Sequence, residues 1–342
     1  MPEFYTCYRR LLELYDAQPK DLAYQAAGAA ETARWQERVR EELGRMAGLP
    51  RMTSCPLDPR HLETVKEDGY FREKWRIETE PGVFMPFYLL LPAGERQTPL
   101  PAVIAPHGHG SFGKEGVAGT IGESGAYGQE LVKAGFAVLC PDARGFGERR
   151  EEPTQEEGKE NASSCDILNF TAISLGLTLT GMWVWDLMRL MDFVEAEPRL
   201  RSGAACCGFS GGGLQALWFA ALDRRVTGAF VSGYMHSYRG TLLRTNLCGC
   251  NFVPGLWERC DPGDIAALIA PRPLFIESGR EDPLNGEDGI VDAMGQAAVI
   301  RQAYAALGAE TALRHMIFEG GHRWDGREAP AFFRTLFERE GA

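Results

Sequence analysis

Short apolar runs alternate with longer helical patterns along most of the chain. From about residue 74 the runs have the length and composition of strands that are buried on both faces of a mostly parallel sheet. Two runs on either side of Pro81-Gly82 are typical of a hairpin, and six more follow. The predicted strands are 74–80, 83–91, 102–106, 136–140, 204–208, 229–232, 274–278 and 313–318. Helical segments are predicted between most of them, at about 122–134, 171–196, 211–222, 290–307 and 328–339. This order predicts an α/β fold with a mostly parallel, eight-stranded sheet flanked by helices.

The remaining segments divide the chain into parts. Residues 1–73 are expected to form a helical extension on the core, because apolar side chains such as Leu11 and Tyr15 recur there at helical spacing. The extension could cap a pocket, form a dimer contact or cover the sheet, and covering the sheet is the default expectation. Residues 74–342 form the expected catalytic domain. Its long connections at 145–170 and 233–263 leave the carboxyl ends of strands, where open α/β sheets bind ligands, so we expect cap-like insertions.

The stretch Gly208-Phe209-Ser210-Gly211-Gly212 contains a G-x-S-x-G motif in an informative context. An apolar run precedes Ser210 and a helical segment follows it, as in a strand-to-helix elbow that presents a nucleophile. The helix N-terminus there would favour developing negative charge. A similar motif around Ser124 follows a glycine-rich loop instead, so we expect Ser124 to be a helix N-cap. Ser210 is therefore the predicted nucleophile.

A serine nucleophile needs a base and an acid that orients the base, in the chain order serine, acid, histidine on this fold. His322 lies on a glycine loop after the last strand, whereas His315 lies within that strand. We therefore predict His322 as the base. Asp282 follows the preceding strand and is the predicted acid, with Glu281 and Glu277 as its competitors.

An oxyanion hole would come from two backbone amides. One is the amide of Gly211, and the other lies in the loop Pro106-His-Gly-His-Gly110, where His109 is the best candidate. A simple turn with two stray histidines is the alternative for this loop.

Three further side chains are candidates for contact with substrate: His107, Arg144 and Trp324. Arg144 is more easily explained as a structural brace between loops. Trp324, next to His322, has a better claim to line a pocket than Trp183 or Trp185, which fit a helix core.

Together these residues resemble the α/β-hydrolase superfamily. The carrying pieces are His107-Gly-His-Gly110, Asp142-Ala-Arg-Gly-Phe-Gly147, Gly208-Phe-Ser-Gly-Gly212, Gly279-Arg-Glu-Asp282 and Gly321-His322, in the family's order. The long helix and the N-terminal extension resemble the dienelactone hydrolase-like and acetyl-xylan-esterase-like branch. The resemblance implies a serine hydrolase that needs no cofactor and acts through an acyl-enzyme.

Departures from that branch bear on the substrate. Dienelactone hydrolases use a cysteine where this chain has Ser210. Related sugar-deacetylating esterases typically carry Arg-Gly-Gln, Gly-x-Ser-Gln-Gly and His-Glu, and this chain differs from all three. We therefore predict a carboxylic-ester hydrolase for a small or medium acyl ester, whose alcohol could be a sugar or another polar alcohol. A peptidase or amidase with the same triad is the runner-up, and a non-catalytic binding protein is the alternative from another class.

The charge and the cysteine content indicate which partners and which cellular compartment to expect. The 342 residues carry a net charge of −11 with no basic run, which argues against nucleic acid and anionic membranes. The first residues lack the apolar core of a signal peptide, so we expect a cytoplasmic protein. Cys248, Cys250 and Cys260 could share a metal with His236, but their spacing matches no zinc pattern. We therefore expect reduced structural thiols and no metal; the oligomeric state stays open.

Overall fold

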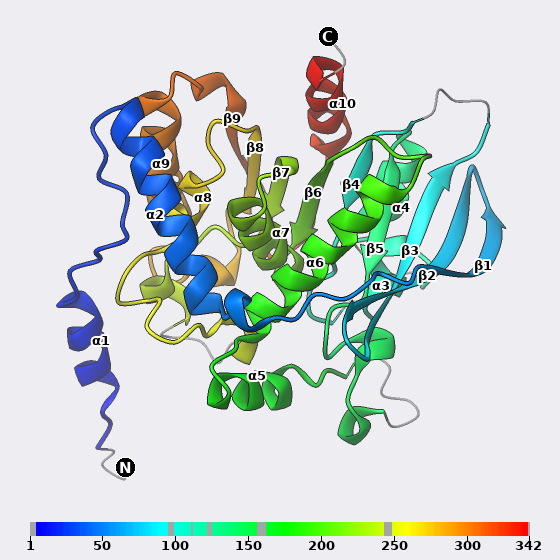
Figure 1. The fold of residues 1–342 in the computed structure, drawn as a ribbon. Helices are drawn as coiled ribbons and strands as arrows, with labels where there is room; N and C mark the ends of the chain where they lie inside the picture. The colour runs from blue at the N-terminus through cyan, green and yellow to red at the C-terminus, as the bar shows by residue number, and fades with distance from the viewer. Residues whose placement is uncertain are drawn as a thin grey trace.

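In the part of the chain that the structure describes, nine strands form one twisted sheet at the centre of the protein (Figure 1). The computed structural model describes residues 5–94, 99–110, 112–121, 125–155, 162–242 and 248–340. The strands are β1 (Arg60–Glu67), β2 (Tyr70–Glu80), β3 (Val83–Pro92), β4 (Ala102–Ile104), β5 (Ala137–Pro141), β6 (Ala204–Phe209), β7 (Val226–Ser232), β8 (Leu274–Gly279) and β9 (Leu313–Phe318). Their order in the sheet is β1-β2-β3-β5-β4-β6-β7-β8-β9.

The predicted α/β-hydrolase architecture is confirmed, but the predicted number of eight strands is wrong. Strands β1, β2 and β3 form an antiparallel meander that joins β5, and the pairs from β5 to β9 are parallel. The missed strand is β1, which lies at the edge and is mostly exposed, so its sequence RHLETVKE carries no apolar pattern. Residues 60–73 therefore belong to the sheet and not to a helical extension.

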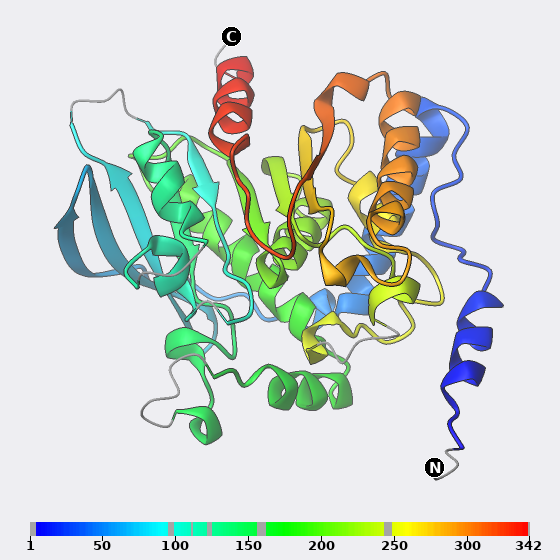
Figure 2. The same ribbon diagram turned by 180° about the vertical axis from the view of Figure 1, so that it is seen from behind.

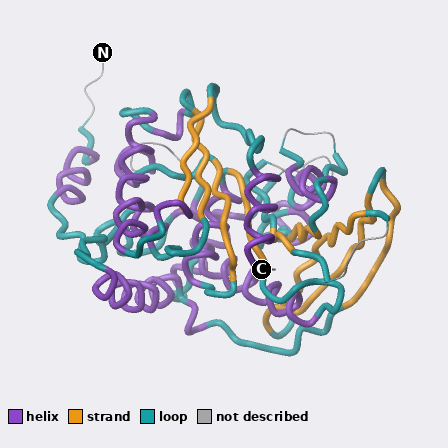
Figure 3. The backbone as a smooth tube through the Cα atoms, turned by 90° about the horizontal axis from the view of Figure 1, so that it is seen from above, coloured by secondary structure: helices purple, strands orange, loops and turns teal. Residues whose placement is uncertain are grey.

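Helices cover both faces of the sheet, as Figures 1 and 2 show from opposite sides and Figure 3 from above. The helices are α1 (Tyr8–Asp16), α2 (Ala29–Ala47), α3 (Lys114–Ala118), α4 (Tyr127–Lys133), α5 (Cys165–Ser174), α6 (Leu179–Ala196), α7 (Gly211–Leu222), α8 (Pro262–Ala267), α9 (Ile290–Ala306) and α10 (Ala329–Glu340). Buried side chains of α2, α6, α7, α8 and α9 share one core, and those of α3, α4 and α10 share the other.

Two predicted helices differ from the observed ones. The segment 171–196 contains a break, because Thr178 ends the turn after α5 and its side chain accepts a hydrogen bond from the Gly181 amide at 3.0 Å, which starts α6. Within the predicted segment 122–134, α4 begins at Tyr127, with Ala126 at the N-cap. Ser124, the predicted N-cap, lies outside the described residues.

Helix α2 packs against α6, α7 and α9. Gln36 of α2 donates hydrogen bonds to the carbonyl oxygens of Ala267 and Ala270, and Trp35 and Val39 are buried beside it. Helix α1 lies further out, where the Tyr15 hydroxyl donates to the Asp261 carboxylate. Helix α2 therefore covers helices that themselves lie on the sheet.

Among the described residues, no single helix is both long enough and apolar enough to cross a membrane. Helices α5 and α6 meet that test only as a pair, across a bend of 100°.

Candidate active site

Ser210 lies on a sharp turn between β6 and α7. Its backbone has φ 56° and ψ −119°, a conformation that non-glycine residues rarely adopt and that persists only where the surroundings impose it. The Ser210 amide donates to the carbonyl oxygen of Ser232 at 2.9 Å, which holds the turn against β7. The serine therefore has the strained elbow that the sequence predicts.

Glycines make this turn possible because other segments press against it. A Cβ atom on Gly208 would lie 2.1 Å from the Gly212 carbonyl oxygen, and one on Gly212 would lie 2.3 Å from the Pro106 carbonyl oxygen. Both obstacles are backbone atoms that cannot rotate away. The motif thus reflects the tight packing of the elbow against the loop that follows β4.

A matched pair of variants checks this packing. Gly212→Ala should lower kcat by about 10²-fold. The new Cβ atom would push the Pro106 carbonyl, and with it the loop after β4, away from the elbow, and a shift of about 1 Å in a well-placed site costs about that much rate. Gly295→Ala in α9 is the control, since no atom lies within 4 Å of its Cβ position. That control should keep full activity and gain about 0.5–1 kcal/mol of stability. Steady-state kinetics and urea unfolding measure both; equal activity of the two variants would contradict the packing argument.

The structure joins Ser210, His322 and Asp282 by hydrogen bonds. The Nε2 atom of His322 lies 2.8 Å from Ser210 Oγ, and its Nδ1 atom lies 2.8 Å from Asp282 Oδ2. The other carboxylate oxygen of Asp282 accepts the Leu284 amide at 2.8 Å, which fixes the carboxylate. An imidazole held between a carboxylate and a hydroxyl in this way can take the serine proton.

Close contact between two loops brings the acid and the base together. The loop with Asp282 follows β8 and the loop with His322 follows β9. A Cβ atom on Gly279 would lie 2.4 Å from the Gly321 carbonyl oxygen. The ring of Phe209 packs on the His322 ring with centroids 4.5 Å apart. Sequence reasoning gave Phe209 no role.

The competing acids and the competing base lie outside the hydrogen-bonded path. Glu277 is buried and accepts hydrogen bonds from Ser232 Oγ and from the amides of Asp325 and Gly326. Burial raises its pKa. The hydrogen bonds from Asp325 and Gly326 to Glu277 hold the loop that carries His322 in place. Glu281 is exposed, and His315 lies 3.1 Å from Ser278 Oγ, with its pKa lowered to about 4 by burial.

The loop after β4 lies against the elbow. A Cβ atom on Gly211 would lie 2.5 Å from the Nδ1 atom of His109 and 3.4 Å from the His109 amide nitrogen. A Cβ atom on Gly108 would lie 2.8 Å from the Phe209 carbonyl oxygen. The two amides predicted for an oxyanion hole are thus neighbours beside Ser210.

None of the three candidates for substrate contact faces the triad. His107 is buried: its Nε2 atom accepts the Ala143 amide at 3.1 Å and its Nδ1 atom lies 2.9 Å from the Gly108 carbonyl oxygen. Burial lowers its pKa, so the ring stays neutral. Trp324 packs on Tyr127 in the core beside α4 and α10 and donates to Glu130. These two assignments to the substrate pocket were wrong, because both side chains complete the interior.

Arg144 is a buried structural brace, the role that the sequence favoured over contact with substrate. Its guanidinium makes two hydrogen bonds to Asp186, at 2.9 and 2.8 Å, and an ion pair with Glu80 at 2.9 Å. Arg149 binds the same Asp186 carboxylate at 2.7 Å. The network ties the loop after β5 to α6 and β2.

Asp186→Asn should cost about 3–5 kcal/mol at neutral pH, because it removes the carboxylate charge that two buried guanidinium groups share and leaves Arg144 with Glu80 to offset its charge. Burial alone would raise the pKa of Asp186, but Arg144 and Arg149 lower it to about 2. The folded pKa thus lies below the unfolded value of about 3.9, so this stabilisation is present above about pH 4 and is lost as the pH falls toward 2. Urea unfolding at several pH values measures it. Glu13→Gln, which removes an exposed ion pair in α1, is the control and should change stability by less than about 1 kcal/mol. Equal losses in the two variants would refute the brace.

Sequence reasoning missed one cluster beside the site. His109 lies near Cys165, Cys248 and Cys250. The possible metal site raised by the sequence instead grouped Cys248 and Cys250 with Cys260 and His236. The four residues of the observed cluster come from three segments that are far apart in the sequence, so spacing gave no signal. Cys206 and Cys207 are buried in β6, and burial raises the pKa of Cys206 to about 12.

Comparison with known proteins agrees with this fold. The model of the Abhydrolase family matches residues 9–286, which include Ser210 and Asp282. "Putative hydrolase YtaP" of Bacillus subtilis (strain 168) is 27% identical over 293 residues, which cover 83% of this chain and 92% of that protein. A protein of Bacteroides fragilis NCTC 9343, described as a "putative acetyl xylan esterase", superposes with a TM-score of 0.81 at 17% identity, over 98% of this chain and 96% of that chain. A glucuronoyl esterase from Solibacter usitatus superposes with a TM-score of 0.65 at 18% identity, over 98% and 99% of the two chains. The chain belongs to the Abhydrolase family and has the α/β-hydrolase fold.

Proposed function

We propose that this protein is a serine carboxylic-ester hydrolase with Ser210, His322 and Asp282 as its catalytic triad. The observation that carries the proposal is the continuous hydrogen-bonded path from Asp282 through His322 to Ser210, with 2.8 Å at each step. This path ends at an elbow whose backbone strain presents the serine.

The proposed reaction has two halves. In the first, His322 removes the Ser210 proton while Oγ attacks the ester carbonyl, and the imidazolium then gives that proton to the departing alcohol. In the second, His322 activates a water molecule that attacks the acyl-enzyme and releases the acid. Asp282 keeps the imidazole in the tautomer with a proton on Nδ1 and stabilises its charged form.

The developing negative charge on the carbonyl oxygen needs donors near Ser210. We assign this role to the amides of Gly211 and His109, which are neighbours at the start of α7. The N-terminus of α7 adds a favourable dipole there.

For the substrate we propose a small or medium acyl ester of a sugar or another polar alcohol. Structural neighbours include proteins described as an acetyl xylan esterase and a glucuronoyl esterase, which act on sugar esters by name. This chain differs from the typical sugar deacetylases beside Arg144, Ser210 and His322. The proposal therefore names the ester class and no particular polysaccharide.

Paired aryl substrates test this function. Aryl acetate, butyrate and octanoate esters should turn over, with the shorter acyl groups preferred, and acetylated monosaccharides should release acetate. The matching aryl amide should react far more slowly, since its leaving group is poorer. Faster turnover of the amide would favour a peptidase or amidase, and no turnover of either by folded protein would favour a binding protein. Ser210→Ala protein is the blank.

A further inference from the structure

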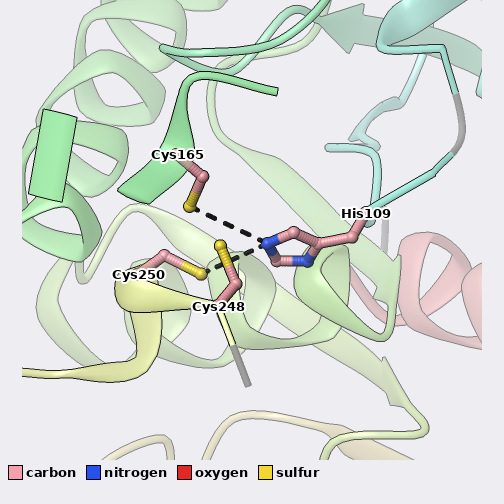
Figure 4. A group of neighbouring side chains, drawn as sticks. All are labelled: His109, Cys165, Cys248 and Cys250. Carbon is pink, nitrogen blue, oxygen red and sulfur yellow. Dashed lines mark hydrogen bonds between the residues drawn. The ribbon is translucent and has the colours of Figure 1, made fainter. Parts of the chain in front are cut away.

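Three thiols and an imidazole converge beside the elbow, as Figure 4 shows. The ligand atoms of His109, Cys165, Cys248 and Cys250 all lie within 4.8 Å of one another. His109 Nε2 is 3.4 Å from the sulfur of Cys250 and 3.9 Å from that of Cys165. The residues belong to the loop after β4, the start of α5 and the segment that follows β7.

These separations fit a single tetrahedral ion. Zinc bonds of about 2.3 Å to sulfur and about 2.0–2.1 Å to nitrogen place neighbouring ligand atoms roughly 3.5–3.8 Å apart. The two nitrogen-to-sulfur distances fall on either side of that range. A disulfide would join only two of the three thiols and would leave the third beside the imidazole without a role.

We propose that His109 Nε2 and the thiolates of Cys165, Cys248 and Cys250 bind one Zn²⁺ ion. Soft sulfur ligands with one imidazole select zinc among the common divalent ions. Binding replaces the three thiol protons, which pass to solvent, and forms three Zn–S bonds and one Zn–N bond without any change of oxidation state. Because the protein supplies all four ligands, the site is a closed, structural one.

Neighbouring groups hold the ligands in place. The side-chain amide of Asn251 donates to Cys250 Sγ at 3.6 Å and is itself held by the Tyr234 hydroxyl, which donates to Asn251 Oδ1 at 2.7 Å. The ring of Phe146 packs edge-on against His109, with centroids 5.3 Å apart. Such supporting contacts orient ligands at metal sites.

The turn that joins Cys248 to Cys250 packs closely against α5. The Gly249 amide donates to Asp166 Oδ1 at 2.7 Å, and a Cβ atom on Gly249 would lie 3.0 Å from that oxygen. The turn therefore docks on α5 directly beside Cys165. Cys165 and Cys250 are buried, whereas His109 is exposed and Cys248 half-buried, which leaves an entry path from solvent.

The proposed zinc site lies next to the elbow and would therefore affect its geometry. The Nδ1 side of the His109 ring faces Gly211, and the Nε2 side faces the thiols. An ion on Nε2 would fix the loop whose amide we assign to the oxyanion hole. It would also tie together the two insertions at 145–170 and 233–263, so His109 acts there as a positioning residue.

Metal content of the full chain tests the proposal without reference to activity. Untagged protein, reduced, loaded with Zn²⁺ and freed of excess metal, should retain one zinc per chain by mass spectrometry of the elements. Cys165→Ser and Cys250→Ser should each lose most of it. Cys7→Ser and Cys55→Ser change thiols outside the cluster and should retain one zinc. Ser210→Ala should also retain one zinc, so a failure of the proposed esterase function leaves this result intact.

Two measurements on unaltered protein cover the case in which a cysteine variant fails to fold. Co²⁺ in place of Zn²⁺ should give thiolate-to-cobalt charge-transfer bands and the intense visible bands of tetrahedral cobalt. Bound zinc should also protect Cys165, Cys248 and Cys250 from alkylation, as read by peptide mass mapping, while Cys7 reacts equally with and without zinc.

The opposite results would overturn the proposal. These are less than about 0.1 zinc per chain after loading, cobalt spectra without thiolate bands, or alkylation of the three cysteines that zinc does not slow. A disulfide between two of them that forms in air, with no metal uptake after reduction, would replace the zinc site by a redox pair.

Discussion

Ser210→Ala should lower kcat by about 10⁴- to 10⁶-fold, while KM and the unfolding temperature change little. The variant removes the proposed nucleophile but keeps the elbow, the proposed base and the proposed oxyanion donors. Rates are to be measured with an aryl acetate under saturating conditions. The residual rate should come from binding and from the oxyanion donors alone.

The chain offers a natural control for this variant. Ser124 lies in the second motif of similar sequence, so Ser124→Ala should keep full activity. His322→Ala should match Ser210→Ala in its loss, and the double variant should lose no more, because the two groups act as one unit. A Ser210→Ala enzyme with a rate within tenfold of the unaltered enzyme would show that another nucleophile performs the reaction.

Asp282→Asn should lower kcat by about 10⁴-fold. An asparagine side chain has nearly the same shape, but its amide group favours the imidazole tautomer with Nδ1 unprotonated. In that tautomer Nε2 carries a proton and cannot accept the one from Ser210. Stopped assays with the same aryl acetate, together with urea unfolding, separate the loss of rate from any loss of stability.

Glu281→Gln is the matched control for the acid. Glu281 is adjacent in sequence and was a competitor for the role, but it is exposed and lies outside the hydrogen-bonded path. Its variant should keep activity within about twofold, because it loses only a solvated surface charge. A large loss in Glu281→Gln with a small loss in Asp282→Asn would reassign the acid.

The sequence predicts those strands and helices whose burial requires a recognisable pattern of apolar residues. Strands β6 to β9 lie in the sheet interior or carry apolar runs, and the predicted ranges overlap the observed ones closely. Strand β1 escaped because an exposed edge strand needs no apolar face. The break between α5 and α6 escaped because the residues around it remain largely apolar, although Gly176, at φ 71°, and the cap at Thr178 mark it.

The candidate site also contains residues that could be predicted from the sequence and residues that could not. Ser210, His322 and Asp282 could be predicted because the chemistry demands an order along the chain and the loops that carry them follow recognisable strands. His107 and Trp324 were misplaced because closeness in sequence to a reacting residue does not show which way a side chain points. Each of them turns into the core.

The cysteine cluster could not be read from spacing at all. Cys165 is 56 residues from His109, and Cys250 is 141 residues from it, so only the folded chain brings them together. The glycines of the elbow show the opposite case. The sequence shows their pattern, but only the structure shows which atoms would clash with a side chain at Gly208 and Gly212.

The most direct test of the central claim is labelling with a fluorophosphonate, followed by mass mapping of the modified peptide. Such a reagent reacts with a serine only where a base and oxyanion donors are assembled around it. We predict label on Ser210 alone, lost in Ser210→Ala and strongly reduced in His322→Ala. Folded protein that takes up no label, or that carries it on another serine, would contradict the assignment of Ser210 as the nucleophile.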